Sequence, residues 1–470
     1  MKYHVGEFFS PHRSGRLIGI TQRSHVHNFD AFGHLQALGP MPTGSIKHQE
    51  ERSLGIGFAQ RREVEVALQE LYIERQIPPI PLDHDLITVI LGPRRAGKSF
   101  FSLHAMVSEE KFGYINFDDE RLIDITDYDE LISALDETYE NPTCLLLDEI
   151  QNLPRWELFL NRLQRQGYRL VVTGSNAHLL GSELATHLTG RHIPVVLFPF
   201  SYSEYVSSLN RELTSIEYVK VLRDYSNSGG FPEPIVKKVQ AGPYLSTLFD
   251  AIIYKDIVRR KHIRKIQGLE DLALYLLSNV AREYSFRALT RVTRCNSVQT
   301  VEKYMRHLEE AFLFFSLRKF SFKHREQVRS NRKVYCIDNG YVTTRGFCFS
   351  ADIGRLYENL VAVELKKKQV LGKLVVFFWQ DARGGEVDFV VKEGLEVTRL
   401  IQVSQSVEDP RTRAREVRAL LRAGDALGCR NLLVLTENEE FSEEHSWYGL
   451  RGEIQFIPLW RWLLQIENQL

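Results

Sequence analysis

The sequence predicts an α/β fold in which a parallel sheet, wound with helices, carries a phosphate-binding loop. Residues 92–99 read GPRRAGKS, which fits the pattern G-x-x-x-x-G-K-[ST] without mismatch. The apolar run at 86–91 before them is typical of a buried parallel strand, and Phe100, Leu103 and Met106 after them continue at helical spacing. This order places a phosphate at a helix N-terminus, where free N–H groups favour anions.

The loop predicts a site for a nucleoside triphosphate. Lys98 is expected to reach the β- and γ-phosphates, and the Ser99 hydroxyl is expected to ligate Mg²⁺. The glycines let the backbone curl so that successive N–H groups point at phosphate oxygens. We expect the nucleotide to be bound by Gly92, Pro93, Arg94, Arg95, Ala96, Gly97, Lys98, Ser99 and Phe100.

A second, acidic motif completes the predicted site. Residues 143–150 read TCLLLDEI, a short stretch of buried-strand character that ends in Asp148 and Glu149. Asp148 is expected to hold Mg²⁺ through water, and Glu149 to orient or deprotonate the attacking water. Two solvated acids often end a strand, but the phosphate loop upstream favours the catalytic interpretation.

Further catalytic candidates follow the next two strands. The strand expected at 168–173 ends in polar residues, and Thr173, Ser175 or Asn176 is placed to contact the γ-phosphate or the lytic water; we favour Asn176. Arg191, before an apolar strand at 193–197, is a candidate for stabilising transition-state charge in its own site or a neighbour's, or else a surface or structural arginine. Four such parallel strands predict a doubly wound sheet whose ligand lies beyond their carboxyl ends.

These motifs carry a family resemblance. The segments GPRRAGKS, LLDEIQNLPRWE, VTGSNAHLL and LTGRH, with FPFSYSEY and GGFP downstream, resemble AAA-type ATPases with a C-terminal DUF4143 domain, over roughly residues 80–460. The resemblance implies an AAA+-like core and implies ATP, with Mg²⁺, as the nucleotide. Nothing in the motifs themselves chooses the base.

Composition limits the remaining possibilities. At 470 residues, two to four domains are expected. No apolar run is long enough to span a membrane, the N-terminus lacks the apolar core of a signal peptide, and the five cysteines form no C-x-x-C pair, so we expect a cytoplasmic protein without a membrane partner. The net charge is zero, which excludes a strongly basic nucleic-acid binder on bulk charge.

Two local basic patches remain as candidate surfaces for nucleic acid, although a run of charge is often only a solvated face. The first patch comprises Lys255, Arg259, Arg260, Lys261, Arg264 and Lys265. The second comprises Arg318, Lys319, Lys323, Arg325, Arg329, Arg332 and Lys333.

The middle of the chain predicts a helical lid followed by a winged helix. Residues 206–280 show helical spacing and are expected to cover the nucleotide. A short helix around 286–292, a helix capped by Ser297 and a strand at 311–317 suggest the winged helix, with the second basic patch as its wing. The exposed face of the capped helix carries Gln299, Thr300, Lys303 and Arg306, residue types that contact bases or phosphates. Winged helices also dock proteins, so DNA contact stays an open alternative.

The C-terminal part resembles a restriction-endonuclease-like core. A helix at 354–368 carries Glu358, and strands at 377–379, 385–391 and 400–404 follow, with Asp388 on the second. That fold implies a helix Glu, a strand Asp and a Glu-x-Lys element around Mg²⁺. Here Gln402 and Ser404 replace the last acid and the lysine, so we expect a degenerate site without cleavage, although Lys392 could substitute for the lysine.

The predicted organisation has five parts: an N-terminal extension with a helical lead-in at 61–75 (1–75), an ATPase core (76–205), a lid (206–280), a winged helix (281–333) and a nuclease-like domain (334–470). No metal-ligand spacing emerges in the first 60 residues. The first hypothesis is an ATP-hydrolysing switch or remodelling ATPase linked to nucleic acid. The alternatives are an ATP-regulated, metal-dependent nuclease and a signalling scaffold that uses ATP to control self-association.

Overall fold

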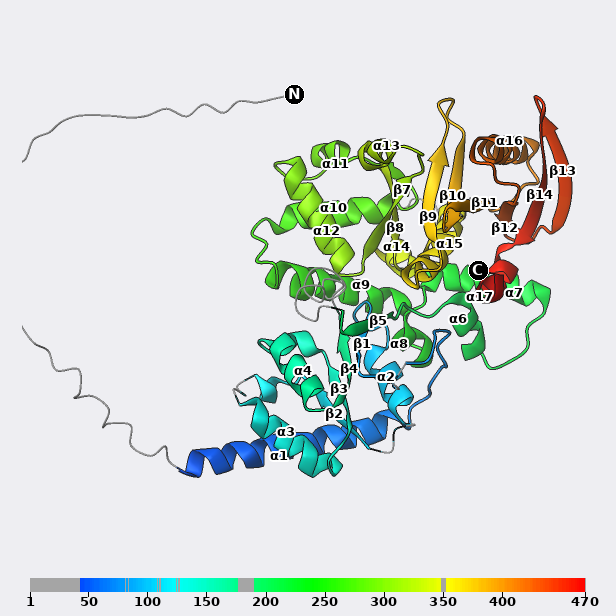
Figure 1. The fold of residues 1–470 in the computed structure, drawn as a ribbon. Helices are drawn as coiled ribbons and strands as arrows, with labels where there is room; N and C mark the ends of the chain where they lie inside the picture. Colours follow the sequence, from blue (N-terminus) through cyan, green and yellow to red (C-terminus); the bar gives the residue numbers. More distant parts are fainter. Residues whose placement is uncertain are drawn as a thin grey trace, which may run out of the picture. The chain divides into compact units, whose positions relative to one another are not determined.

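The structure, a computed structural model, describes residues 43–470 apart from 81, 83, 108, 110, 124, 126, 176–189, 348–351 and 470 (Figure 1). Residues Glu50–Leu470 form one compact unit. The predicted parts beyond residue 76 are therefore segments of one compact unit. Within the described residues, no helix combines the length and apolar character needed to cross a membrane.

Two sheets organise the unit. The first contains β1 (Ile87–Leu91), β2 (Phe112–Asn116), β3 (Cys144–Asp148), β4 (Arg169–Gly174) and β5 (His192–Val196). The second contains β6 (Glu283–Tyr284), β7 (Phe314–Lys319), β8 (Arg332–Cys336), β9 (Val375–Gln380), β10 (Glu386–Glu393), β11 (Glu396–Val403), β12 (Leu432–Thr436), β13 (Phe441–Trp447) and β14 (Leu450–Pro458).

The helices of the first half are α1 (Thr43–Ala67), α2 (Lys98–Met106), η1 (Glu120–Leu122), α3 (Tyr128–Tyr139), η2 (Ile150–Asn152), α4 (Trp156–Arg165), α6 (Tyr202–Ser208), α7 (Ser215–Ser228) and α8 (Pro232–Val236). Those of the second half are α9 (Ala241–Ala251), the π-helix η4 (Ile252–Arg259), α10 (Ile266–Ser278), α11 (Phe286–Val292), α12 (Val298–Glu310), α13 (His324–Arg329), α14 (Asn339–Arg345), α15 (Ile353–Val370), α16 (Pro410–Leu427) and α17 (Leu459–Gln469).

The first sheet confirms the predicted parallel core. Its order is β2-β3-β4-β1-β5, and every neighbouring pair is parallel. Alternate side chains of β1 enter different hydrophobic clusters, because Val89 and Leu91 join the cluster that contains α4 whereas Ile90 joins the one that contains α2. Helices therefore cover both faces, as a doubly wound sheet requires.

Strand β2 is the element of this sheet that the sequence did not reveal. Gly113 interrupts its apolar pattern, and glycine is depleted in strands. The close neighbours explain the residue: a Cβ at Gly113 would lie 2.9 Å from a side-chain carbon of Leu145 and 3.0 Å from one of Pro142. Packing against β3 thus selects a residue that weakens the local strand signal.

The segment after the first sheet is helical, as expected for 206–280. Helix α6 begins before the predicted boundary at 205, because Ser201 and Glu204 form a capping box at its N-terminus. Thr214 and Glu217 do the same for α7. The helical lead-in ends earlier than predicted, since α1 ends at Ala67, and residues 70–73 and Arg75 line the nucleotide cavity described below.

The region predicted as a winged helix contains the expected short helices and strands. Ser297 is the N-cap of α12, and its hydroxyl accepts a hydrogen bond from the Thr300 N–H (3.2 Å). Val301, Met305 and Leu308 of α12 are buried. The second basic patch differs from its prediction, because it contains helix α13 and because Lys333 on β8 is only 2% exposed.

The second sheet joins this region to the C-terminal part. Its order is β13-β14-β12-β11-β10-β9-β7-β8-β6, in which β7 pairs with β9 in parallel. Strands β9, β10 and β11 pair antiparallel. The predicted boundary between residues 333 and 334 falls inside β8, so the predicted winged helix and nuclease-like domain share one sheet.

Candidate functional site: a nucleotide cavity

The predicted phosphate loop connects the end of β1 to the start of α2. Gly92 has a φ of 155°, and a Cβ there would lie 2.0 Å from the carbonyl oxygen of Leu197. Gly97 precedes α2 in the left-handed region, with a φ of 90°. Both glycines are therefore required by the backbone, one by close approach and the other by its conformation.

Lys98 lies under this loop with its ammonium against the loop's own carbonyls. Its Nζ is 3.3 Å from the oxygen of Gly92 and 3.1 Å from that of Pro93, and the residue is 4% exposed. Burial lowers the pKa of Lys98, and Glu149 and Asp148 oppose that shift. The ammonium is thus placed where negative phosphate oxygens would restore its favourable charge environment.

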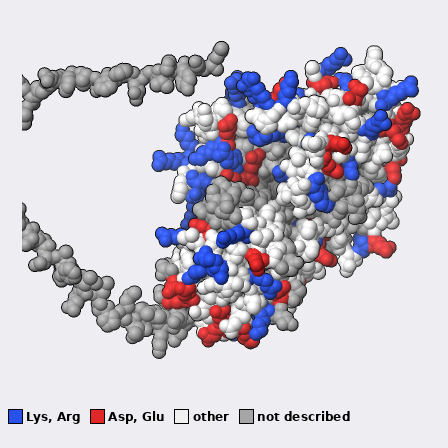
Figure 2. Space-filling model, in the orientation of Figure 1, with Lys and Arg blue, Asp and Glu red and all other residues white. Residues whose placement is uncertain are grey.

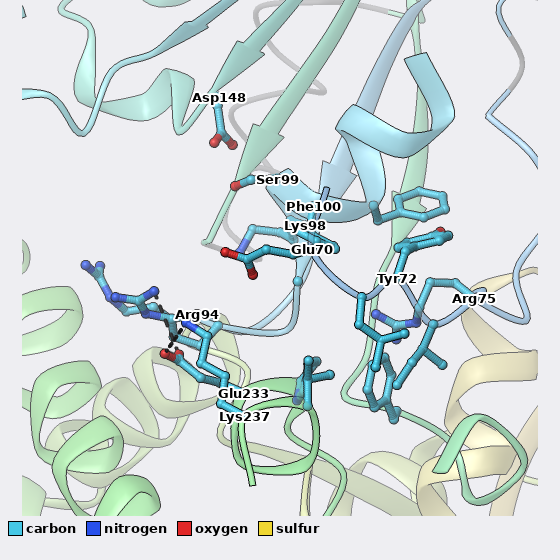
Figure 3. Close-up of a pocket in the computed structure, with 18 of the residues that line it drawn as sticks. Glu70, Tyr72, Arg75, Arg94, Lys98, Ser99, Phe100, Asp148, Glu233 and Lys237 are labelled. Carbon is cyan, nitrogen blue, oxygen red and sulfur yellow. Dashed lines mark hydrogen bonds and ion pairs between the residues drawn. The ribbon is translucent and has the colours of Figure 1, made fainter. Parts of the chain in front are cut away.

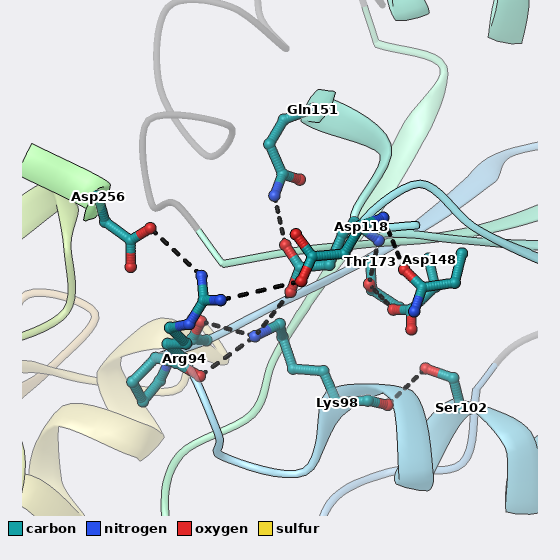
Figure 4. Close-up of polar contacts among 12 residues, drawn as sticks. Arg94, Lys98, Ser102, Asp118, Asp148, Gln151, Thr173 and Asp256 are labelled. Atoms are coloured by element: carbon teal, nitrogen blue, oxygen red, sulfur yellow. Dashed lines mark hydrogen bonds and ion pairs between the residues drawn. The ribbon is translucent and has the colours of Figure 1, made fainter. Parts of the chain in front are cut away.

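Asp148, at the end of β3, lies among three hydroxyl groups. It accepts hydrogen bonds from Thr173 Oγ1 and from Tyr114 Oη (3.1 Å), and the Ser99 hydroxyl faces it. Burial, and then the neighbouring Glu149, raise its pKa. Figure 3 shows Ser99 and Asp148 facing one another, and Figure 4 shows Thr173 beside Asp148.

The donor set fits Mg²⁺. The ion prefers oxygen ligands, usually one or two from protein with the remainder from water and phosphates. Ser99 and Asp148 supply one hydroxyl and one carboxylate at the mouth of the phosphate loop. Among the described residues no group of three or more His, Cys, Asp or Glu side chains is placed to hold a metal ion.

Glu149 follows β3 in the left-handed region, with a φ of 50°. Its Oε1 lies 3.8 Å from Lys98 Nζ, and its Oε2 accepts a hydrogen bond from Gln151 (Figure 4). Burial opposes its charge, but Lys98, the hydrogen bond from Gln151 and the nearby Ser175 hydroxyl outweigh burial and lower the pKa of Glu149. An ionised carboxylate beside the phosphate loop can orient or deprotonate water.

The remaining catalytic candidates have different outcomes. Thr173 is buried and is hydrogen-bonded to both acidic residues. Its Oγ1 donates to the Asp148 carboxylate and accepts from the backbone N–H of Glu149 (3.0 Å). Ser175 is 3% exposed and helps to lower the pKa of Glu149. Asn176, the favoured sensor, lies outside the described residues.

Arg191 does not join this site. It precedes β5, its side chain is exposed, and its carbonyl accepts from the Ile87 N–H (2.9 Å) at the start of β1. The phosphate loop leaves β1 at the other end, after Leu91, roughly 13 Å along the strand at about 3.3 Å per residue. A catalytic role of Arg191 within its own site is therefore wrong.

The loop and the acids line a cavity with a volume of about 490 cubic ångströms (Figure 3). Two further segments also line it, one that the sequence did not reveal and one from the predicted lid. Residues 70–73 and Arg75, before the sheet, supply Tyr72, whose ring stacks on His104 of α2 at 3.9 Å between centroids. Around α8, the lid supplies Pro232, Glu233, Val236 and Lys237. The predicted lid thus does reach the cavity.

Arg75 fixes the phosphate loop from behind. Its guanidinium donates to the carbonyl oxygens of Ala96 (3.0 Å) and Phe198 (2.5 Å) and to Glu204 Oε1 (3.0 Å). Burial opposes the charge of Glu204, but Arg75 and other partners outweigh it and lower the pKa of Glu204. The buried ion pair connects the loop to α6.

Arg94 connects the loop to η4. Its Nη1 lies 3.4 Å from Asp256 Oδ1, and its Nη2 lies 3.8 Å from Asp118 Oδ2 (Figure 4). Asp256 belongs to the segment YKDIV, for which the sequence suggested no chemistry. The pair is separated by 162 residues in the chain, so no local pattern could have shown it.

Known proteins match the chain in three successive parts. An AAA domain matches residues 84–206, a domain of unknown function (DUF8612) matches 219–345, and another (DUF4143) matches 353–462. An uncharacterized protein of Methanocaldococcus jannaschii is 31% identical over 428 residues, which cover 85% of this chain and 93% of that protein. The chain belongs to this AAA–DUF4143 family.

Other relatives add little about activity. An uncharacterized protein of Haemophilus influenzae is 29% identical over 339 residues, covering 67% of this chain and 82% of that protein. AMPPCP-bound DnaA from Aquifex aeolicus is similar with a TM-score of 0.27 and 16% identity over 47% of this chain and 81% of that one. The Aeropyrum pernix ORC1 protein in complex with DNA is similar with a TM-score of 0.28 and 13% identity, covering 67% of this chain and 94% of that one. At these TM-scores the two structures carry no conclusion about activity.

The DUF4143 part of this AAA–DUF4143 protein contains the second predicted site. Glu358 on α15 and Asp388 on β10 come together, as expected, around Lys333 of β8. Lys333 Nζ lies 2.9 Å from Glu358, 3.0 Å from Asp388 and 2.5 Å from Glu386. Burial would lower the pKa of Lys333, but the surrounding carboxylates and Tyr335 outweigh it and raise the pKa well above its ordinary value.

The other predicted members of this cluster play structural roles. Gln402 Oε1 accepts from the Asp388 N–H (3.2 Å), and Ser404 donates to the Ser406 carbonyl (2.9 Å). Lys392 donates to the Gly394 carbonyl (2.5 Å) at the hairpin turn, and its suggested role as the substitute lysine stays a prediction. Lys333, from strand β8 of the same sheet, lies among the acids as their cationic partner.

Proposed function

We propose that this AAA–DUF4143 protein binds ATP with Mg²⁺ and hydrolyses it, and that it acts as a switch or remodelling ATPase. The observation that carries the proposal is the cavity in which the Lys98 ammonium, the Ser99–Asp148 pair and the ionised Glu149 converge on the phosphate loop. ATP rather than GTP follows from the family. Lys98 would bind phosphate oxygens, Ser99 and Asp148 would hold the ion, and Glu149 would activate water.

Glu149→Gln tests hydrolysis. The amide keeps the shape of the side chain but cannot accept a proton, so phosphate release should fall by about 100-fold or more while ATP still binds. Glu137→Gln, an exposed acid on α3, is the matched control. Phosphate release by Glu149→Gln at the wild-type rate would contradict the proposal, and tight ATP binding without any wild-type turnover would instead support a scaffold.

Self-association is a further part of the proposal. Arg191 is exposed and lies away from its own phosphate loop, so it could only stabilise transition-state charge in a neighbouring copy. Hydrolysis per molecule should then rise with protein concentration and fall on Arg191→Ala. A specific activity that does not change with concentration argues against this arrangement.

A nucleic-acid link is the last part. The region from α10 to β8 has the helix and strand order of a winged helix, and the exposed face of α12 carries Gln299, Lys303 and Arg306. Cleavage of nucleic acid is not favoured, because Lys333 already occupies the space among the carboxylates of Glu358, Glu386 and Asp388 where a metal would bind.

A further inference from the structure

A basic hollow with a volume of about 280 cubic ångströms lies between the segment that follows η4 and helix α12. Arg264 and Lys265 line it from one side, and Arg294 and Lys303 from the other. Arg294 lies 3.4 Å from Asp271. Within the described part of the chain, no carboxylate pairs with Arg264, Lys265 or Lys303, and all three side chains are exposed.

The polar lining of the hollow suits a phosphate group. Asn296 and Thr300 add an amide and a hydroxyl beside the four cations, and amides, hydroxyls and basic side chains are the usual partners of backbone phosphates. Because cations without anionic partners repel one another, a bound anion would stabilise this arrangement.

The hollow continues onto one exposed face of α12. Gln299, Lys303 and Arg306 follow one another at helical spacing, and each is exposed; Glu302 is the acid among them. Figure 2 shows that Lys and Arg side chains gather over the part of the surface that α10–α13 occupy in Figure 1. The basic hollow is thus part of a larger cationic surface.

We infer that this surface binds duplex DNA, with one backbone phosphate in the basic hollow and α12 against the major groove. The inference rests on the proposed nucleic-acid link and locates it. A single strand would need exposed large aromatic rings for stacking, whereas Tyr304, the tyrosine of the hollow, is 6% exposed, and the other ring there is the smaller imidazole of His262. The major groove of duplex RNA is too narrow for a helix, and that of DNA admits one.

The test compares two pairs of substitutions with equal loss of charge. Lys265→Gln with Lys303→Gln removes two cations of the hollow, and Arg411→Gln with Arg418→Gln removes two exposed cations of α16. Fluorescence anisotropy with a labelled duplex, at several salt concentrations, measures affinity. The hollow pair should lower affinity about 10-fold or more and reduce the salt slope by about 2, whereas the α16 pair should change both little.

Glu302→Gln provides a change in the opposite direction. Removing this acid from the exposed face of α12 should tighten DNA binding, because it lies among the cations that face the phosphates. Equal losses in the hollow and α16 pairs would overturn the inference, as would absence of duplex binding by the wild type at low salt. Tighter binding of single-stranded DNA or duplex RNA than of duplex DNA would overturn it too.

The same proteins separate this inference from the proposed ATPase. Phosphate release by the wild type is measured without nucleic acid, so turnover without duplex binding would leave the ATPase standing and reject the DNA surface. Duplex binding by Glu149→Gln and the wild type, with no turnover by either, would reject the ATPase and leave the surface standing.

Discussion

Arg75 shows how one buried side chain can organise the phosphate loop through the loop's own backbone. Its guanidinium serves the carbonyls of Ala96 and Phe198 and the carboxylate of Glu204 at once. Only the planar, multi-donor geometry of arginine matches three such acceptors. Arg75 is thus a positioning residue that holds Ala96 where the loop must curl.

Arg75→Lys should weaken nucleotide binding without unfolding the protein. A lysine keeps the charge beside Glu204 but cannot reach all three acceptors, so one charge-assisted hydrogen bond is lost, and the dissociation constant for an ATP analogue should rise about 10-fold. Nucleotide titration measures the effect, and Arg62→Lys on the exposed face of α1 is the control. An unchanged dissociation constant, with unchanged stability in urea, would show that Ala96 is held in place by other contacts.

At this scale the sequence revealed residues that act through local spacing. The octet at 92–99, Asp148 and Glu149 stand in recognisable order because each ends or follows a strand of the same sheet. Arg75 and its partner Glu204 are 129 residues apart, and nothing local marks either of them. Contacts of that kind depend on the complete fold.

At the scale of elements, a buried carboxylate joins the lid to the helix α14. Asp338 is the N-cap of α14, where its Oδ1 accepts from the Gly340 N–H (2.8 Å), and its Oδ2 accepts from the Gly230 N–H (2.7 Å) in the turn before α8. The turn approaches the carboxylate so closely that position 229 needs glycine, because a Cβ there would lie 1.9 Å from Asp338. The GGFP motif of the lid and the start of α14 thus meet in one contact.

Burial raises the pKa of Asp338 to about 6. A raised pKa in the folded state favours the protonated carboxyl. The contribution of this group to the free energy of unfolding is therefore complete below its ordinary pKa of 3.8 and is lost as the pH rises through about 6. The difference between these two pKa values corresponds to roughly 3 kcal/mol in the free energy of unfolding. Asp338→Asn cannot titrate, so wild-type stability relative to this variant should fall between pH 4 and pH 7.

Urea unfolding across that pH range measures the difference, with Asp425→Asn, an exposed residue of α16, as the control. A stability gap between wild type and Asp338→Asn that stays constant with pH would show that Asp338 does not titrate there. Wild-type stability that rises with pH relative to Asp338→Asn would instead indicate a depressed pKa.

Elements were predictable where their own residues determine them. Ser297 starts α12 through its own hydroxyl, and the apolar run before Gly92 forms β1. The parallel pairing of β7 with β9 was not predictable, because strands so far apart in the chain leave no mark on each other's pattern. Lys333 was counted in a surface patch for the same reason, since its partners Glu358 and Asp388 come from other elements.

At the scale of the whole molecule, a chain of contacts connects the nucleotide cavity to the basic hollow. Arg94 of the phosphate loop pairs with Asp256 on η4, and η4 leads directly into residues 260–265. Lys261 in that segment pairs with Glu310 at the end of α12 (3.1 Å). A π-helix such as η4 is rare and is frequently found at functional sites. Arg94 both lines the cavity and pairs with Asp256, so phosphates bound there would compete with Asp256 for it.

If phosphates draw Arg94 away from Asp256, nucleotide binding must change the segment that carries Arg264 and Lys265. Duplex affinity should then differ about 5-fold or more between the nucleotide-free and ATP-bound Glu149→Gln protein, and duplex should change ATP affinity by the same factor. Adding Asp256→Asn, which keeps the shape but removes the charge that competes for Arg94, should reduce both factors toward 1, whereas Asp224→Asn on the exposed face of α7 should not. Equal coupling with and without Asp256→Asn would mean that the nucleotide signal takes another route, such as the α6 contact through Arg75.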